Sequence, residues 1–260
     1  MLTINKVLVV YMEPETAEGK KTIAEVRSVV AKQHCSCRIK ERNQITDTDC
    51  KEADLIIAVG GDGTFLRAAQ FNQSAVLMGV NLDPSNKVGF FACATRKDFA
   101  LKFSKVMHGD YKLSKLPRIE TRIKGSKVEF GLNEVYYGHN LPYKMCRYEL
   151  EMNGKKEQQR SSGVLVGTGA GSHAWIKSAG GKTFSVHSKK LQYLVREPYA
   201  DFAPVTLRNG FLQPGQEIKI WSAAEENILV VDGLSQEYKI PAKTEVKIRL
   251  AKDPVKVVMF

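Results

Sequence analysis

The sequence has no apolar run close to the roughly 18 residues that a membrane-spanning helix needs. Its first residues, MLTINKVLVVYMEPETAEGKK, turn to acids and lysines after a short apolar stretch. They also lack the small-residue cleavage pattern of a secretory signal. We therefore expect a soluble, cytoplasmic protein without a membrane partner.

Cysteine is scarce. The five cysteines contain no CxxC pair and no histidine at the spacing of a zinc site. The stretch HCSC, residues 34–37, offers too few ligands for a tetrahedral metal. Reduced thiols are expected, and the sequence predicts no metal-ligating residues.

Acidic residues are outnumbered, with 28 Asp and Glu against 39 Lys and Arg, for a net charge of +11. Such a charge favours anionic partners such as nucleotides or polyphosphate. The basic residues are scattered singly, however, and no basic run is interleaved with aromatics. We therefore expect no nucleic-acid partner.

The first third of the chain alternates between strand and helix patterns. Short apolar runs at 6–11, 54–60 and 75–80 predict buried strands, and apolar residues at helical spacing predict a helix within 15–33. The stretch TFLRAAQF, which follows the second run, has the composition of a helix. This order predicts a parallel α/β sheet.

From about residue 112 the pattern changes to period-two alternation, and Asn153-Gly154 predicts a hairpin. Only 185–198 has the pattern of a helix in this part. We therefore predict an α/β domain over residues 1–105 and a β-rich, sandwich-like domain over residues 106–240.

The glycine turn GGDGT, residues 60–64, follows a predicted strand of the α/β sheet. Ligands bind beyond the carboxyl ends of such strands, where backbone N–H groups of a glycine turn reach phosphate oxygens. The turn is neither a G-x-G-x-x-G motif nor a Walker loop. Beside polyphosphate, Asp62 would hold Mg²⁺ or take a proton from an attacking hydroxyl, which points to phosphoryl transfer. From spacing alone, an ordinary Asp-Gly turn explains the motif equally well.

Three ordered motifs carry a family resemblance. The turn GGDGT resembles the signature of NAD kinases, of diacylglycerol and sphingosine kinases and, more loosely, of phosphofructokinases. The stretch GLNEVYYG, residues 131–138, looks like the Asn-Glu motif of NAD kinases. The segment RSSGVLVGTGAGSHAWIKSAGG, residues 160–181, matches that family's glycine-rich segment in register. The resemblance to NAD kinases covers roughly residues 54–235.

The resemblance implies a Rossmann-like N-terminal α/β domain and a β-rich C-terminal domain, with the tail, about 240–260, packing back on the first. It implies transfer of the γ-phosphoryl group of ATP, or of polyphosphate, to the 2′-hydroxyl of the adenosine ribose of NAD. Mg²⁺ or another divalent cation would accompany ATP. A homodimer or homotetramer is also implied.

The resemblance gives Asp62 the catalytic role at the ribose hydroxyl. Residues of the glycine turn would line the phosphates, and those of the later motifs would bind the adenine, ribose and remaining dinucleotide. The binding candidates are Gly61, Gly63, Thr64, Phe65, Phe90, Phe91, Asn133, Glu134, Arg160, Ser162, Ala170, His173, Ala174, Trp175, Ser178 and Asp232.

The third motif departs from the usual family pattern. Ser162-Gly163 stands for Asp-Gly, Gly167-Thr168-Gly169 for Ser-Thr-Pro, and Trp175 for Tyr. These departures resemble the mitochondrial-type branch of NAD kinases. A carboxylate lost near the nicotinamide end leaves the choice between NAD⁺ and NADH open. Two alternatives also stay open: a lipid kinase sharing GGDGT, and a non-catalytic NAD(P)-binding protein.

Overall fold

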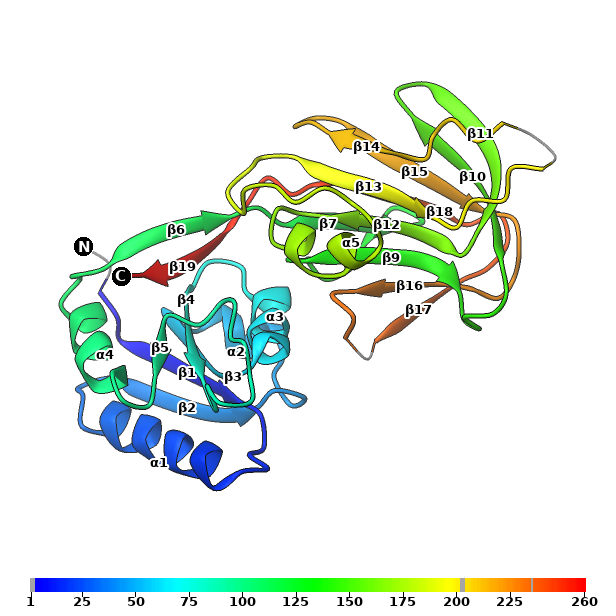
Figure 1. Cartoon of the computed structure of the whole chain (residues 1–260). Coiled ribbons are helices and arrows are strands. Elements are labelled where there is room, and N and C mark those ends of the chain that lie inside the picture. Colours follow the sequence, from blue (N-terminus) through cyan, green and yellow to red (C-terminus); the bar gives the residue numbers. More distant parts are fainter. Residues whose placement is uncertain (1–2, 202–203, 235) are drawn as a thin grey trace. The chain divides into compact units, whose positions relative to one another are not determined.

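The computed structural model describes residues 3–201, 204–234 and 236–260. The chain forms two compact units (Figure 1). Unit 1 holds residues up to 115 together with 255–260, and unit 2 holds residues 116–254. The division falls after residue 115 rather than at the predicted residue 105, which lies inside a helix. Of the predicted returning tail, only the last six residues belong to unit 1.

Unit 1 is a seven-stranded sheet in the order β2-β1-β3-β4-β19-β6, with β5 paired to β4. The first four strands, β5 and β19 pair in parallel. The elements are β1 (Lys6–Tyr11), α1 (Ala17–Ala31), β2 (Ser36–Glu41), α2 (Asp47–Lys51), β3 (Leu55–Gly60), α3 (Asp62–Phe71), β4 (Val76–Asn81), β5 (Ala94–Thr95), α4 (Phe99–Met107), β6 (Lys112–Leu116) and β19 (Val255–Met259). The strands and helices predicted from periodicity are confirmed here.

Helices cover both faces of this sheet, as Figure 1 shows for α1 and α3. Alternate strand residues such as Val9 and Ile57 share one hydrophobic cluster with Val26 of α1 and Phe103 of α4. The helix α3 packs against β1, β3 and β4 and takes no part in that cluster. Because both faces are buried, β3 and β4 are continuous apolar runs rather than alternating ones.

Unit 2 is a sandwich of two antiparallel six-stranded sheets, β11-β10-β15-β18-β7-β8 and β14-β13-β12-β9-β16-β17. Its elements are β7 (Ile119–Ile123), β8 (Ser126–Lys127), β9 (Glu134–His139), β10 (Cys146–Met152), β11 (Lys155–Ser161), β12 (Gly163–Gly167), a 3-10 turn (Gly171–His173), α5 (Trp175–Ser178), β13 (Leu191–Arg196), β14 (Asn209–Leu212), β15 (Glu217–Ser222), β16 (Asn227–Val231), β17 (Glu237–Ile240) and β18 (Glu245–Leu250). One core joins inward residues of both sheets, among them Tyr148, Ile220, Tyr137 and Val166. The predicted sandwich-like fold is confirmed.

The predicted hairpin at Asn153-Gly154 joins β10 to β11. Both residues have positive φ, 52° and 78°, as a type I′ turn requires. The predicted helix over 185–198 is wrong: residues 191–196 form β13 between β12 and β14. Leu191, Tyr193 and Val195 alternate into the core, so period two overrides the helical composition.

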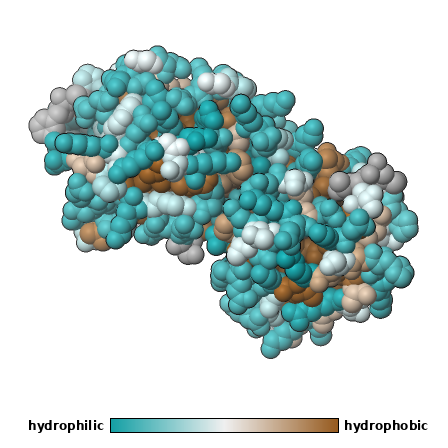
Figure 2. Space-filling model, turned by 180° about the vertical axis from the view of Figure 1, so that it is seen from behind, coloured by the Kyte–Doolittle hydropathy of each residue, from teal (hydrophilic) through white to brown (hydrophobic). Residues whose placement is uncertain are grey.

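The surface of both units is mainly hydrophilic on the face shown in Figure 2, with small hydrophobic patches. Within the described residues, no helix is long and apolar enough to cross a membrane.

Candidate active site

The glycine turn lies at the carboxyl edge of the parallel sheet in unit 1. The strand β3 ends at Gly60, and α3 begins at Asp62 with Gly61 in an extended conformation at its N-cap. No side chain caps this helix. A Cβ at Gly60 would overlap the Thr64 side chain, which explains the need for glycine. The Thr64 N–H donates to Gly61 O at 3.0 Å, whereas those of Asp62 and Gly63 have no backbone partner among the described residues, so this end of the helix favours an anion.

Asp62 is the first residue of α3 and is partly exposed. Its Oδ1 accepts a hydrogen bond from the backbone N–H of Phe91 at 3.1 Å. Its second oxygen has no hydrogen-bond partner among the described residues. The carboxylate is therefore oriented by the segment after β4 while one oxygen stays available.

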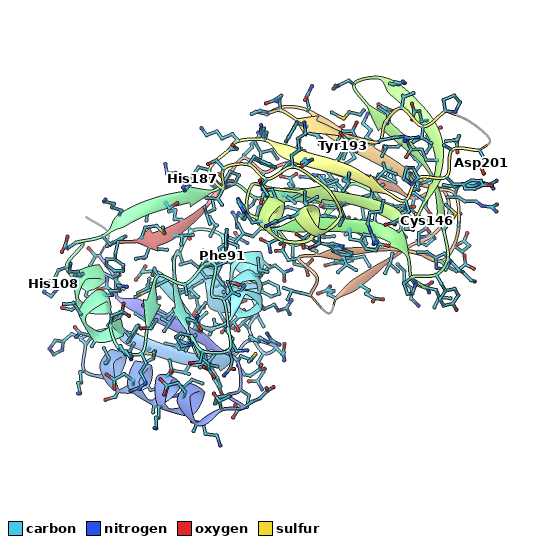
Figure 3. The ribbon with its side chains drawn as sticks, viewed as in Figure 1. Phe91, His108, Cys146, His187, Tyr193 and Asp201 are labelled. Atoms are coloured by element: carbon cyan, nitrogen blue, oxygen red, sulfur yellow. The ribbon has the colours of Figure 1, made fainter. Side chains whose placement is uncertain are left out.

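The two predicted phenylalanines have different surroundings. Phe91, labelled in Figure 3, is buried and stacks on Phe65 with ring centroids 4.8 Å apart. Phe90 meets Phe91 edge-on and is 48% exposed. Phe65 and Phe91 thus join the turn to the segment after β4, and Phe90 is the ring that remains accessible to a ligand.

A buried carboxylate organises the Asn-Glu motif of unit 2. Asp232 follows β16 with φ 56° and accepts hydrogen bonds from the backbone N–H groups of Leu132, Asn133 and Glu134, at 2.7–3.1 Å. Asn133 Oδ1 and Glu134 Oε2 are buried without a hydrogen-bond partner among the described residues. We call Asn133, Glu134 and Asp232 the Asn-Glu corner. A buried oxygen without a partner is costly, so the corner is suited to polar groups of a ligand.

The glycine-rich segment packs directly against this corner. Thr168 Oγ1 donates to Leu132 O at 2.6 Å and accepts from the N–H groups of Ala170 and Gly171. A Cβ at Gly171 would overlap the backbone of Asn133. The density of glycines therefore reflects close backbone approach, and it brings the buried Ala170 to the same corner.

The two carboxyl groups of the corner share one low-dielectric environment. Burial and the neighbouring charge of Asp232 raise the pKa of Glu134 to about 8. Burial raises the pKa of Asp232 to about 7, while the three backbone N–H groups oppose this rise by stabilising its ionised form. At neutral pH, Glu134 therefore carries a proton and can donate a hydrogen bond.

An aromatic and cationic cluster surrounds Ser162, the residue that replaces the usual aspartate. The Tyr136 hydroxyl donates a hydrogen bond to Ser162 O at 2.7 Å. The ring centroids of Tyr136 and Trp175 lie 5.0 Å apart. The guanidinium of Arg196 lies 5.4 Å from the centroid of the Trp175 ring. Its Nε is buried and has no hydrogen-bond partner in the described part of the chain. Arg196 was not among the residues predicted from the sequence; it lies in the stretch VREP, residues 195–198.

The remaining candidates, His173, Ser178 and Arg160, have separate surroundings. His173 is exposed, with a ring nitrogen 3.3 Å from Phe184 O, and Ser178 lies on the exposed side of α5 next to Ala174. Arg160 lines a cavity of about 280 Å³ with Arg147, Gln158, Gln159, Tyr199, Val205 and Ala223. None of the residues that line this cavity belongs to the Asn-Glu corner.

Comparison with known families identifies the family of this chain. A model described as the ATP-NAD kinase N-terminal domain matches residues 2–111, and one described as the ATP-NAD kinase C-terminal domain matches residues 132–260. The chain belongs to the ATP-NAD kinase family. This family assignment agrees with the resemblance carried by the three motifs, and it favours that reading over a lipid kinase.

Individual relatives of the ATP-NAD kinase family are distant. A probable NADH kinase from Oryza sativa subsp. japonica is 30% identical over 86% of this chain and 76% of its own length. An NAD kinase from Thermoplasma volcanium is 29% identical over 80% and 74%.

Two solved structures share the fold. An NAD kinase from Archaeoglobus fulgidus in complex with ATP has a TM-score of 0.77 at 21% identity, over 97% of this chain and 92% of that one. Yeast NADH kinase complexed with NADH has a TM-score of 0.83 at 17% identity, over 99% and 84%. At these identities the likeness establishes the fold of an ATP-NAD kinase.

Proposed function

We propose that this protein is an NAD kinase, which transfers the γ-phosphoryl group of ATP to the 2′-hydroxyl of the adenosine ribose of NAD. One observation carries the proposal: Asp62 stands at the open N-terminus of α3 with one oxygen fixed by Phe91 and the other available. A carboxylate beside bound phosphates serves a reaction better than it serves binding alone. It can orient the hydroxyl and accept its proton, while the turn's N–H groups stabilise charge on the transferred group.

The Asn-Glu corner supports a nucleoside acceptor. Asn133 Oδ1 accepts hydrogen bonds, and Glu134 in its protonated form both donates and accepts. Such a set is suited to ribose hydroxyls and to an adenine edge. We propose that Asp232 contacts no ligand, because its oxygens already bind three backbone N–H groups.

A divalent cation fits these residues as a companion of the phosphates. No group of three His, Cys, Asp or Glu side chains in the described residues could hold a metal ion. Mg²⁺ is usually held by one or two carboxylates together with substrate phosphates. Asp62 offers one such carboxylate, and the cation would neutralise charge on the donor phosphates.

NADH is a second candidate acceptor, favoured by the cluster around Ser162. The oxidised nicotinamide ring carries a positive charge and the reduced ring does not. If that ring lies beside Ser162, as the resemblance implies, Arg196 repels the oxidised form, and the carboxylate of Glu197, 3.5 Å from Arg196 Nη2, offsets only part of this charge. Two charges 6–8 Å apart near a surface interact by roughly 2–3 kcal/mol, about a 30- to 150-fold effect before the opposing charge of Glu197 is counted. Replacing Arg196 with Gln, or Ser162 with Asp, should raise kcat/KM for NAD⁺ relative to NADH by up to that factor. An unchanged ratio in both variants would contradict this assignment.

The activity itself is tested with the purified full chain. ATP-Mg²⁺ is supplied with NAD⁺ or NADH, and the NADP(H) formed is measured by enzymatic cycling, with polyphosphate as a second donor. A chain that binds NADP but forms none is a binding protein, and label transferred to diacylglycerol instead of NAD identifies a lipid kinase. We also propose a homodimer or homotetramer, which sedimentation velocity tests directly.

A further inference from the structure

Two cationic side chains lie beside the glycine turn. Arg42 directly follows β2, and its backbone N–H donates to Tyr11 O at the end of β1. A Cβ added at Gly63 would lie 3.5 Å from the terminal nitrogen Nη1 of Arg42. The guanidinium therefore lies beside the second residue of α3.

Lys87 reaches the turn from the loop after β4. Its Cδ would lie 3.2 Å, and its Cγ 3.8 Å, from a Cβ at Gly61. The backbone holds the lysine in place, since Asn81 Nδ2 donates to Lys87 O at 2.9 Å. The aliphatic stem thus lies over the N-cap of α3, and glycine at position 61 leaves room for it.

Neither cation is neutralised by the protein. Within the described residues, the charged groups of Arg42 and Lys87 form no ion pair and no hydrogen bond, not even with Asp62. The cations on β2 itself differ, because Arg38 and Lys40 both pair with Asp49. Two uncompensated positive charges beside a helix N-terminus repel one another until an anion joins them.

A third group indicates the same ligand. Thr64 is fully buried in the first turn of α3, and its Oγ1 has no hydrogen-bond partner among the described residues. The hydroxyl faces Gly60, where β3 ends and the turn begins. A buried donor without a partner, the N–H groups of Asp62 and Gly63 and two unpaired cations together match the oxygens of a phosphate group.

We propose that Arg42 and Lys87 bind the phosphate groups received by the glycine turn, which rests on the proposed function as a kinase. The phosphates belong to the donor triphosphate or to the pyrophosphate of the dinucleotide, and both present the same chemistry. Arg42 would bind phosphate oxygens through its forked N–H groups, and Lys87 as a point charge.

The test removes the charges while keeping the packing. Arg42→Met and Lys87→Met retain the aliphatic stems, so the stem over Gly61 stays in place. Each variant should raise KM for a phosphate-bearing substrate about tenfold or more, and the double variant should raise it further. Measuring KM separately for ATP and for NAD shows which phosphates are bound. Lys87→Arg, which restores the charge, should recover most of the loss.

Matched controls remove the same charge elsewhere in unit 1. Arg27→Met on α1 and Lys105→Met on α4 alter the net charge equally but touch no residue of the turn. They should leave both KM values within twofold. Unchanged KM values in the double variant would overturn the proposal, as would an equal effect in the controls.

A direct binding assay separates this proposal from the proposed function. Calorimetry with ATP and with inorganic tripolyphosphate is performed on the wild type and the double variant. If the wild type forms no NADP, the kinase proposal fails, yet a lower affinity of the double variant still supports phosphate binding. If the wild type is active and affinities do not differ, only the assignment of Arg42 and Lys87 fails.

Discussion

Replacing Glu134 with Gln should change how the stability of the protein depends on pH. The substitution preserves the size of the side chain and removes its titration. In the folded chain, burial and the charge of Asp232 raise the pKa of Glu134 from 4.5 to about 8. In the unfolded chain the group returns to its ordinary value, so the folded state binds more protons between these two pH values.

The sign and size of the effect follow from this difference. Because the folded state binds the extra proton, its stabilising contribution is complete below about pH 4.5 and is lost as pH rises through about 8. One pKa unit corresponds to 1.36 kcal/mol. Across this pH range, the free energy of unfolding of the wild type should therefore fall by roughly 3–5 kcal/mol relative to that of Glu134→Gln. This is a large part of the 5–15 kcal/mol of a typical domain.

Urea denaturation of both proteins at pH 5 and at pH 9 measures the difference. The matched control is Glu157→Gln. Although burial of Glu157 acts to raise its pKa, hydrogen bonds from Thr206 and Leu207 lower it to about 2. Its contribution is therefore constant between pH 5 and pH 9. A stability difference between wild type and Glu134→Gln that does not change with pH would refute the reasoning.

Other substitutions test the remaining contacts. Asp232→Asn places an amide against the backbone N–H groups that now donate to a carboxylate. It should lower the free energy of unfolding, measured by urea denaturation, by about 2–4 kcal/mol. Unchanged stability would show that these hydrogen bonds contribute little. Gly79→Ala brings a Cβ within 2.5 Å of Phe91 O and should displace the segment that orients Asp62, lowering kcat at least tenfold with a stability loss of about 1–3 kcal/mol. Wild-type kinetics in that variant would show that the segment adapts. Gly154→Val places a β-branched residue at φ 78°. It should destabilise the folded protein by about 1–2 kcal/mol, observed as a lower melting temperature, and leave the enzyme kinetics unchanged.

Periodicity was sufficient to predict most of the fold. The buried runs of β1, β3 and β4 have no polar face because helices cover both sides of their sheet. The alternating stretches of unit 2 have one face in a shared core, which gives them a clear period of two. Sequence periodicity fails to predict the element where a helical pattern and a strand pattern occur in the same segment. Residues 191–196 combine helix-forming leucine and glutamine with alternate burial, and the neighbouring strands β12 and β14 decide the outcome.

The site was predictable only where its residues share a local motif. The glycine turn and the Asn-Glu pair are each contiguous, so the sequence marks both as candidates. Arg42 and Lys87 lie 20 or more residues from Asp62, and nothing local distinguishes them from other surface cations. Their position depends on the parallel order of β2, β1, β3 and β4, which brings four carboxyl ends to one edge. The role of Asp232 likewise depends on strand pairing between β16 and β9.

Asp62→Asn tests the central claim most directly. The amide keeps an oxygen that can accept the Phe91 N–H, so the turn should remain folded. It cannot accept a proton from the 2′-hydroxyl. NADP(H) formation from ATP-Mg²⁺ should fall by about 10²–10⁴ in kcat. Formation of NADP(H) by Asp62→Asn at the wild-type rate would contradict the account.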